Sequence, residues 1–141
     1  MATSGYTDVV VTKYDTLHFS WSRTSYDPAN NTSTISWELQ LISSAYGAIG
    51  SNANKSWSVN VNGTGYSGTN KITIGNNSTK SLASGSTTIA HNSDGTKSFA
   101  YSFSQEFGIK FGGSTINTVS GSGASTLDRI PRASSVTVTS G

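Results

Sequence analysis

Two stretches in which apolar and polar residues alternate decide the fold of this chain. Residues 17–22 read LHFSWS, and residues 35–41 read ISWELQL. Apolar side chains recur at every second position, which is the period of a β-strand with one buried and one wet face. Between the two stretches lies the run Asp27-Pro28-Ala29-Asn30-Asn31, a strong turn signal. The sequence therefore predicts a β-hairpin over residues 13–43.

The same alternation continues along the chain. It marks residues 57–61, the long run 97–107 and, over shorter lengths, residues 72–74 and 87–91. No window of helical length shows apolar residues at a period of 3.6. We therefore predict an all-β chain that forms an antiparallel β-sandwich, either jelly-roll or Ig-like. The aromatic residues expected to be buried in its core are Trp37, Trp57, Tyr101 and Phe103.

Glycine-containing runs separate these predicted strands. Asn62-Gly63 and Ser84-Gly85-Ser86 are expected to form turns. Asn92-Ser93-Asp94-Gly95 is expected to close a β-hairpin, because Asp-Gly supplies the positive φ angles that tight hairpin turns need. Residues 112–114 and 121–123, which contain only glycine and serine, are expected to be flexible.

The C-terminal residues change in character. Ile130-Pro131 forms a rigid break, and residues 135–139 start a fresh alternating strand. We expect residues 1–127 to form the β-sandwich module. Residues 128–141 are expected to be a linker and the start of a following domain, loosely held against the module.

Composition excludes several classes of protein. Only 11% of the 141 residues are charged, the net charge is +2, and no cluster of Lys or Arg is present. Nucleic-acid binding is not expected, because it needs a concentrated basic surface. The chain has no cysteine. Its start lacks the basic and apolar runs of a signal peptide, and no stretch is long enough for membrane insertion.

No catalytic, metal or cofactor site is predicted. The chain has two His, five Asp and two Glu, and it lacks the Gly-x-Ser-x-Gly motif of a serine nucleophile. Glu38 and Glu106 could form a glycosidase pair, but a wet strand face explains each of them. His91, Asn92 and Asp94 resemble a fragment of a calcium loop that lacks the remaining ligands. The chain is therefore expected not to be an enzyme.

Four stretches, in order, carry a resemblance to a known family. They are residues 30–37 (NNTSTISW), 57–63 (WSVNVNG), 91–97 (HNSDGTK) and 127–136 (LDRIPRASSV). The chain resembles a minor structural or tail protein of siphophages that infect Gram-positive bacteria, where such a module lies near the N-terminus. The resemblance implies a virion protein that is made in the bacterial cytoplasm. It also implies that other phage tail proteins are its partners and that each virion carries multiple copies.

The polar and aromatic residues suggest carbohydrate binding. Sugars pack on exposed aromatic rings and hydrogen bond to amides and carboxylates. Trp21 is expected to be half-exposed near the end of its strand, and three tyrosines are expected in loops, where function is concentrated on β scaffolds. Polar residues of two predicted strands would share one wet face if the strands were neighbours. The candidate carbohydrate-binding residues are Trp21, Tyr26, Glu38, Gln40, Tyr46, Asn60 and Tyr66.

Two hypotheses about function follow. In the first, the chain binds a host cell-wall polysaccharide. In the second, it is a structural spacer or docking domain of the tail without a ligand. A glycan module needs exposed aromatic rings beside a polar groove, whereas a docking domain needs an apolar patch at its junction.

Overall fold

The computed structural model describes residues 2–51, 53–111 and 113–131. Every regular element in this part is a β-strand, so it contains no helix that could cross a membrane. The strands are β1 (Ser4–Thr12), β2 (Asp15–Asp27), β3 (Thr32–Ser43), β4 (Ile49–Gly50), β5 (Lys55–Val61), β6 (Thr64–Asn70), β7 (Thr73–Ile74), β8 (Thr79–Ala90), β9 (Lys97–Phe111) and β10 (Ser114–Leu127).

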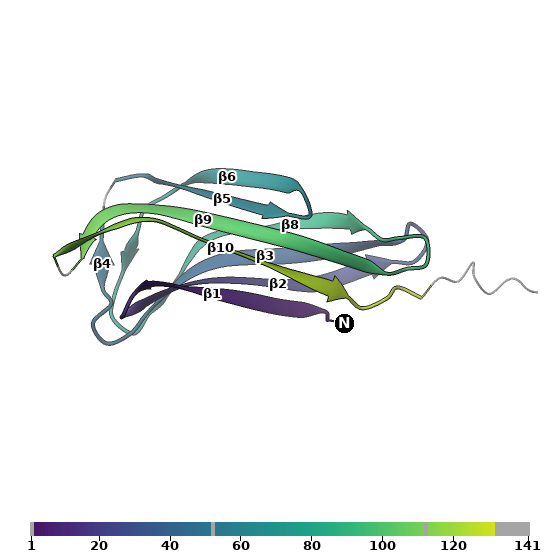
Figure 1. Ribbon diagram of the computed structural model, residues 1–141, viewed down its shortest axis with the longest axis horizontal. Helices are drawn as coiled ribbons and strands as arrows, with labels where there is room; N and C mark the ends of the chain where they lie inside the picture. Colours follow the sequence, from purple (N-terminus) through teal and green to yellow (C-terminus); the bar gives the residue numbers. More distant parts are fainter. Residues whose placement is uncertain (1, 52, 112, 132–141) are drawn as a thin grey trace, which may run out of the picture.

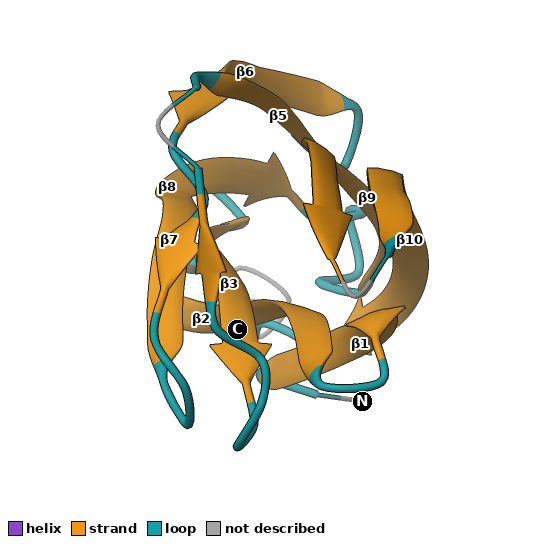
Figure 2. Ribbon diagram, turned by 90° about the vertical axis from the view of Figure 1, so that its left-hand side faces the viewer, coloured by secondary structure: helices purple, strands orange, loops and turns teal. Residues whose placement is uncertain are grey.

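The strands form two antiparallel four-stranded sheets that pack face to face. One sheet has the order β1-β2-β3-β8, and the other has the order β10-β9-β5-β6. Strands β4 and β7 pair separately at one end. Figures 1 and 2 show an elongated sandwich, with the strands running along its length. The predicted all-β sandwich is confirmed.

A side-chain hydrogen bond links the two sheets at each open side of the sandwich. On one side, the hydroxyl groups of Thr7 in β1 and Tyr101 in β9 lie 2.5 Å apart. On the other side, the Tyr66 hydroxyl in β6 donates to the carbonyl oxygen of Ser86 in β8, at 3.1 Å. These links leave the two outer faces of the sheets as the broad exposed surfaces.

The core lies between the two sheets and is rich in aromatic rings. Phe19 stacks on Phe103, with ring centroids 5.1 Å apart. Trp37, Tyr101 and Phe103 are buried, as predicted. Trp57 is only partly buried, although its ring lies 6.0 Å from that of Trp37. Trp57 packs against the core without being fully covered, whereas Val59 and Val61 of the same strand are buried.

Glycines lie directly across from aromatic residues on neighbouring strands. A Cβ atom on Gly85 would come within 2.6 Å of Trp37 Cζ2, so the indole lies flat over the glycine. The predicted turn at 84–86 is therefore wrong, since these residues continue β8. The predicted flexibility of 121–123 is also wrong, because these residues lie within β10. The pairs are Gly5 with Trp21, Gly68 with Trp57, Gly85 with Trp37, Gly121 with Phe103, and Gly123 with Tyr101.

The turn at residues 92–95 carries the chain from one sheet to the other. Gly95 has the expected positive φ of 88°. The strands on either side, β8 and β9, belong to different sheets, so the predicted hairpin is wrong. His91 is buried at this crossing, with Nδ1 2.8 Å from the carbonyl oxygen of Gly95 and Nε2 2.7 Å from the Ser33 hydroxyl. Burial lowers the pKa of His91.

The first residues after β10 pack on this crossing. The Ile130 side chain is fully buried, and its backbone N–H donates to the carbonyl oxygen of Gly95 at 3.0 Å. Arg23 donates to the carbonyl oxygen of Asp128 at 2.9 Å. The packed module therefore extends through Ile130, beyond the boundary that we placed at residue 127. Residues 132–141, which hold the rest of the linker predicted over 128–141 and the strand predicted at 135–139, lie outside the described residues, so the domain division stays a prediction.

Candidate functional site

The outer face of the β1-β2-β3-β8 sheet forms a shallow trough of about 760 Å³. Strand alternation sends the large apolar residues of β2 and β3 into the core and leaves polar residues on this face. The antiparallel registers then align these polar residues into three rows that each cross all four strands. The rows are Ser4-Ser22-Ser36-Ser86, Tyr6-Ser20-Glu38-Ser84 and Asp8-His18-Gln40-Ser81.

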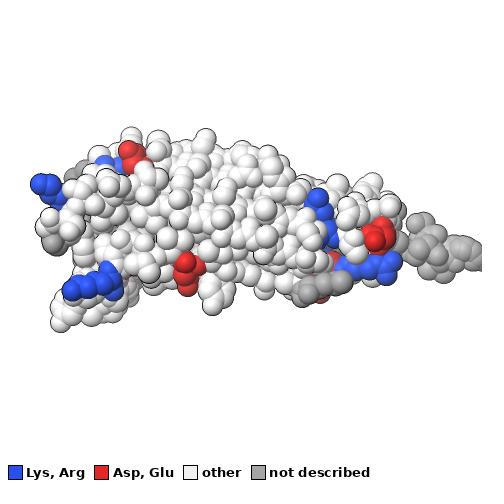
Figure 3. Space-filling model, viewed as in Figure 1, with Lys and Arg blue, Asp and Glu red and all other residues white. Residues whose placement is uncertain are grey.

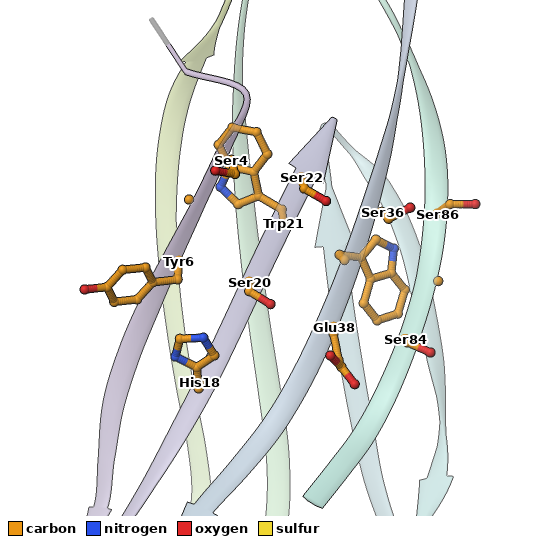
Figure 4. A pocket seen from close by; sticks show the side chains of 13 residues that line it. Ser4, Tyr6, His18, Ser20, Trp21, Ser22, Ser36, Glu38, Ser84 and Ser86 are labelled. Carbon is orange, nitrogen blue, oxygen red and sulfur yellow. The ribbon is translucent and has the colours of Figure 1, made fainter. Parts of the chain in front are cut away.

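An aromatic pair stands at one rim of the trough. The Tyr6 ring is 66% exposed and stacks on the His18 ring, with centroids 5.2 Å apart. Nδ1 of His18 forms a hydrogen bond with the carboxylate of Asp8 on the neighbouring strand. Figure 4 shows both rings beside the line of serines. The pair with Asp8 holds the imidazole in place, so that the exposed phenol ring rests on a fixed support.

Glu38 and Gln40 lie on this same face, as the sequence predicted for wet strand positions. Glu38 lies between Ser20 and Ser84 in the row that starts at Tyr6. Within the described residues, its carboxylate makes no hydrogen bond or ion pair. The trough therefore combines an exposed aromatic ring, serine hydroxyls and an unpaired carboxylate, and the Gln40 amide lies on the same face in the next row.

The outer face of the second sheet has a hollow of similar size, about 790 Å³, but a different chemistry. Tyr66 and Phe103 line this hollow, but the Tyr66 ring packs against Trp37 and Phe103 is buried in the core, so neither ring is exposed as that of Tyr6 is. Outside the hollow, on the same face, Glu106 accepts from the Ser56 backbone N–H at 3.0 Å and from the Ser56 hydroxyl, and these hydrogen bonds lower the Glu106 pKa. The central rows of this face are Ser120-Ser104-Ser58-Ser67 and Ser122-Ser102-Asn60-Gly65.

Charged residues are sparse on the sides of the sandwich. In the view of Figure 3, Lys and Arg lie toward the two ends, and most of the surface between them is uncharged. No Lys or Arg lines the trough. No three acidic, His or Cys residues of the described part come together in an arrangement that could hold a metal ion.

A third feature is an aromatic cluster at the end of the sandwich where β1 turns into β2. The ring of Tyr46, 71% exposed, packs edge-on against Tyr14 at 5.6 Å, and Tyr14 lies 6.4 Å from Phe111. An apolar hollow of about 590 Å³ lies beside Tyr14. The hollow is lined by Val11, Thr12, Lys13, Tyr14, Phe111, Ser114, Thr115, Ile116, Asn117 and Val119.

A family model described as a siphovirus protein of unknown function matches residues 15–141. The chain belongs to this siphovirus protein family. The predicted resemblance is thus confirmed at the level of the family. No curated protein and no solved structure matches the chain. In this siphovirus protein, β1, with Tyr6 and Asp8, precedes the matched residues.

The remaining predicted binding residues of the siphovirus protein are dispersed. Trp21 is only 3% exposed and packs edge-on against Phe99 in the core, so the expected half-exposure is wrong. Tyr26 lies at the end of β2 rather than in a loop, is 47% exposed and lies under the Arg23 guanidinium. Tyr66 is not in a loop either: it lies on β6, and its ring packs 5.3 Å from Trp37. Tyr46 lies in the loop after β3, as predicted.

The polar face that we expected from two strands is not shared. Glu38 and Gln40 lie on β3, whereas Ser58 and Asn60 lie on β5 in the other sheet. The two pairs therefore point away from the sandwich on opposite sides. Asn60 also has a local role, because its side-chain oxygen accepts from the Gly63 N–H at 3.0 Å and supports the β5–β6 turn.

Sequence reasoning missed Tyr6 and His18. Within β1, Tyr6 and Val10 alternate with Val9 and Val11, so both faces of the strand carry large apolar residues. Hydrophobic alternation alone cannot tell which of these faces is buried. His18 carried a usable signal, since it alternates with Leu17 and Phe19 on the polar side of the best-defined strand.

Proposed function

We propose that this siphovirus protein is a component of the phage tail that binds a host cell-surface polysaccharide through the trough on the β1-β2-β3-β8 sheet. The observation that carries the proposal is the exposed Tyr6 ring, supported by His18, at the rim of a trough lined with hydroxyls. A rigid ring gives contact area at small entropic cost. The nearby serines, Glu38 and Gln40 supply acceptors and donors that can orient sugar hydroxyls.

A single trough would bind weakly because it is open and shallow. We expect a Kd in the μM to mM range, since such a surface removes little area of the ligand from water. Several copies on one tail would raise the overall affinity by about 10²–10⁴ through effective concentration. Weak, reversible contacts of this kind suit a tail that samples a bacterial surface.

The second candidate function is a structural docking domain, and the aromatic end favours it. Tyr14, Tyr46 and Phe111 stand beside an apolar hollow. Exposed apolar surface rimmed by polar residues is typical of contacts between proteins. In this hypothesis, the hollow receives another tail protein, and the trough is a solvated face.

Matched tyrosine variants separate the two hypotheses. The parent, Tyr6→Ala and Tyr46→Ala are each fused to a fluorescent protein, multimerised and added to host cells. The two tyrosines have similar exposure, 66% and 71%, but lie on different surfaces. We expect Tyr6→Ala to bind roughly tenfold more weakly, the effect of losing about 1.4 kcal/mol of binding free energy. Tyr46→Ala should label cells like the parent.

Three outcomes would contradict the proposal. Equal labelling by the parent and Tyr6→Ala would remove the trough from the site. Loss of labelling only in Tyr46→Ala would move the site to the aromatic end. The absence of labelling by the multimerised parent would favour the docking domain.

A further inference from the structure

Glu38 is unusual among the acidic residues that face outward from the two sheets. Glu106, on the opposite face, accepts hydrogen bonds from both the backbone and the side chain of Ser56 and has Lys55 nearby. Asp8 is paired with His18. Glu38 is partly buried among serines but makes no such contact within the described residues. A partly desolvated carboxylate is stabilised by a cationic partner, and the described part of the protein supplies none.

Apart from His18, the titratable groups on the face that holds the trough are acidic. Asp8 and Glu38 both lie on this face, and no Lys or Arg lines it. An acidic polymer would bring further negative charge toward unpaired carboxylate oxygens, which disfavours binding. A ligand that carries positive charge would be attracted instead, even though the chain as a whole has a net charge of +2.

Tyr6 adds a second group that attracts cations. The face of a tyrosine ring attracts an ammonium group through its quadrupole. Tyr6 and Glu38 lie in the same row with only Ser20 between them. Neighbouring strands are about 4.8 Å apart, so the two positions are separated by about 10 Å across the sheet. A polymer with repeated amino groups can therefore place one near Tyr6 and another near Glu38.

We infer that the polysaccharide bound in the trough is an amino-sugar polymer with free ammonium groups, rather than a fully N-acetylated or an acidic one. This inference rests on the proposed function and specifies its ligand. Glu38 supplies the ionic contact, Tyr6 supplies the cation–π contact, and the serine rows bind the hydroxyl groups. The contacts are non-covalent, and the ammonium groups keep their protons.

The test compares two forms of the same oligosaccharide. Glucosamine oligomers with free amines and their N-acetylated counterparts of equal length are titrated into the parent by calorimetry, at a mildly acidic pH that keeps the amines protonated. We expect the free-amine form to bind roughly tenfold more tightly. Glu38→Gln should remove this preference. Glu106→Gln changes the net charge equally on the opposite face and should retain it.

Purified host polysaccharide, before and after chemical N-acetylation, completes the experiment. N-acetylation should weaken binding to the parent roughly tenfold and leave Glu38→Gln unaffected. Unchanged binding after N-acetylation, or a preference that survives in Glu38→Gln, would overturn the inference while the proposed function stands. Binding of the host polysaccharide without binding of the free-amine oligomers would also count against it. If the parent does not bind the native host polysaccharide, the proposed function fails as well.

Discussion

The two outer faces of the sandwich have similar hollows and similar rows of serines, but they differ in the aromatic and charged residues that lie among the serines. The β1-β2-β3-β8 face carries Tyr6, His18 and an unpaired Glu38. The β10-β9-β5-β6 face carries Glu106, which is already bound to Ser56. A surface rich in hydroxyls is therefore common to both faces and cannot locate a binding site. The two faces are distinguished by the carboxylate of Glu38, which has no hydrogen-bond partner among the described residues and lies near an exposed aromatic ring.

The largest expected effect concerns the core that supports both faces. Trp37 is buried beneath the trough, whereas Trp57, on the other sheet, is only partly buried. Trp37→Ala should lower the free energy of unfolding by about 3–5 kcal/mol, as for other buried aromatic residues. Trp57→Ala should cost clearly less. Urea unfolding measures both, and a loss below about 1 kcal/mol for Trp37→Ala would show that its burial does not support the fold.

The glycines beneath the two faces should give the next largest effect. Gly85→Ala would place a Cβ 2.6 Å from Trp37, and Gly121→Ala would place one 2.5 Å from Val9 and 2.6 Å from Phe103. Each should destabilise the protein by about 1–3 kcal/mol through overpacking. Gly65→Ala is the control, because its nearest neighbour would be 3.9 Å away. Thermal unfolding that ranks Gly65→Ala with the other two would contradict this account of the glycine–aromatic pairs.

The crossing between the sheets should make stability depend on pH. Burial lowers the pKa of His91 below its ordinary value of 6.5. Above pH 6.5 the His91 imidazole is neutral in both the folded and the unfolded chain, so it does not lower the free energy of unfolding. As the pH falls below that value, the unfolded state binds a proton first, and the free energy of unfolding decreases down to the folded-state pKa.

Replacing the crossing histidine should remove that slope. We expect His91→Asn to lower the stability at neutral pH by about 1–3 kcal/mol, since it loses buried hydrogen bonds. Its unfolding free energy should then vary less with pH between 6.5 and 5 than that of the parent. Denaturant unfolding across this range provides the measurement, and parallel pH profiles would show that His91 is not responsible.

The smallest effect compares the two outward-facing glutamates directly. Hydrogen bonds from Ser56 lower the pKa of Glu106, so this group stabilises the fold above its unfolded-state pKa and loses that effect as the pH falls. Glu106→Gln should therefore be slightly less stable than the parent at neutral pH, and the difference should vanish in acid. Glu38→Gln should match the parent throughout. A larger stability loss for Glu38→Gln would reveal a partner for that carboxylate.

Sequence patterns predicted the strands better than the way in which they assemble. The alternation in residues 17–22 and 35–41 correctly gave the hairpin of β2 and β3 and the burial of Trp37, although Trp21 was expected to be half-exposed and is buried. Ser84-Gly85-Ser86 was mistaken for a turn, because a glycine opposite a tryptophan is a tertiary feature that no local pattern reveals. The crossing at residues 92–95 failed as a hairpin for the same reason, since a tight Asp-Gly turn does not specify which strands pair.

The candidate site was predictable only in part. Glu38 and Gln40 followed from the wet side of a clear strand. Tyr6 could not be found, since both faces of β1 carry large apolar residues. Asn60 was grouped with Glu38 because their strands look alike, although sheet membership depends on long-range pairing. Local periodicity thus gives the face of a strand, while the partner strands decide which faces combine into one surface.

Equivalent substitutions at the centres of the two faces test the central claim most directly. Ser20→Arg fills the trough, and Ser104→Arg fills the hollow on the opposite face. Both serines are partly buried and lie on inner strands, and both substitutions add the same charge. Calorimetric titration with purified host polysaccharide should show binding to the parent and to Ser104→Arg, but binding at least roughly tenfold weaker to Ser20→Arg. Equal affinities for all three proteins, or a loss confined to Ser104→Arg, would contradict the assignment of the β1-β2-β3-β8 face as the binding surface.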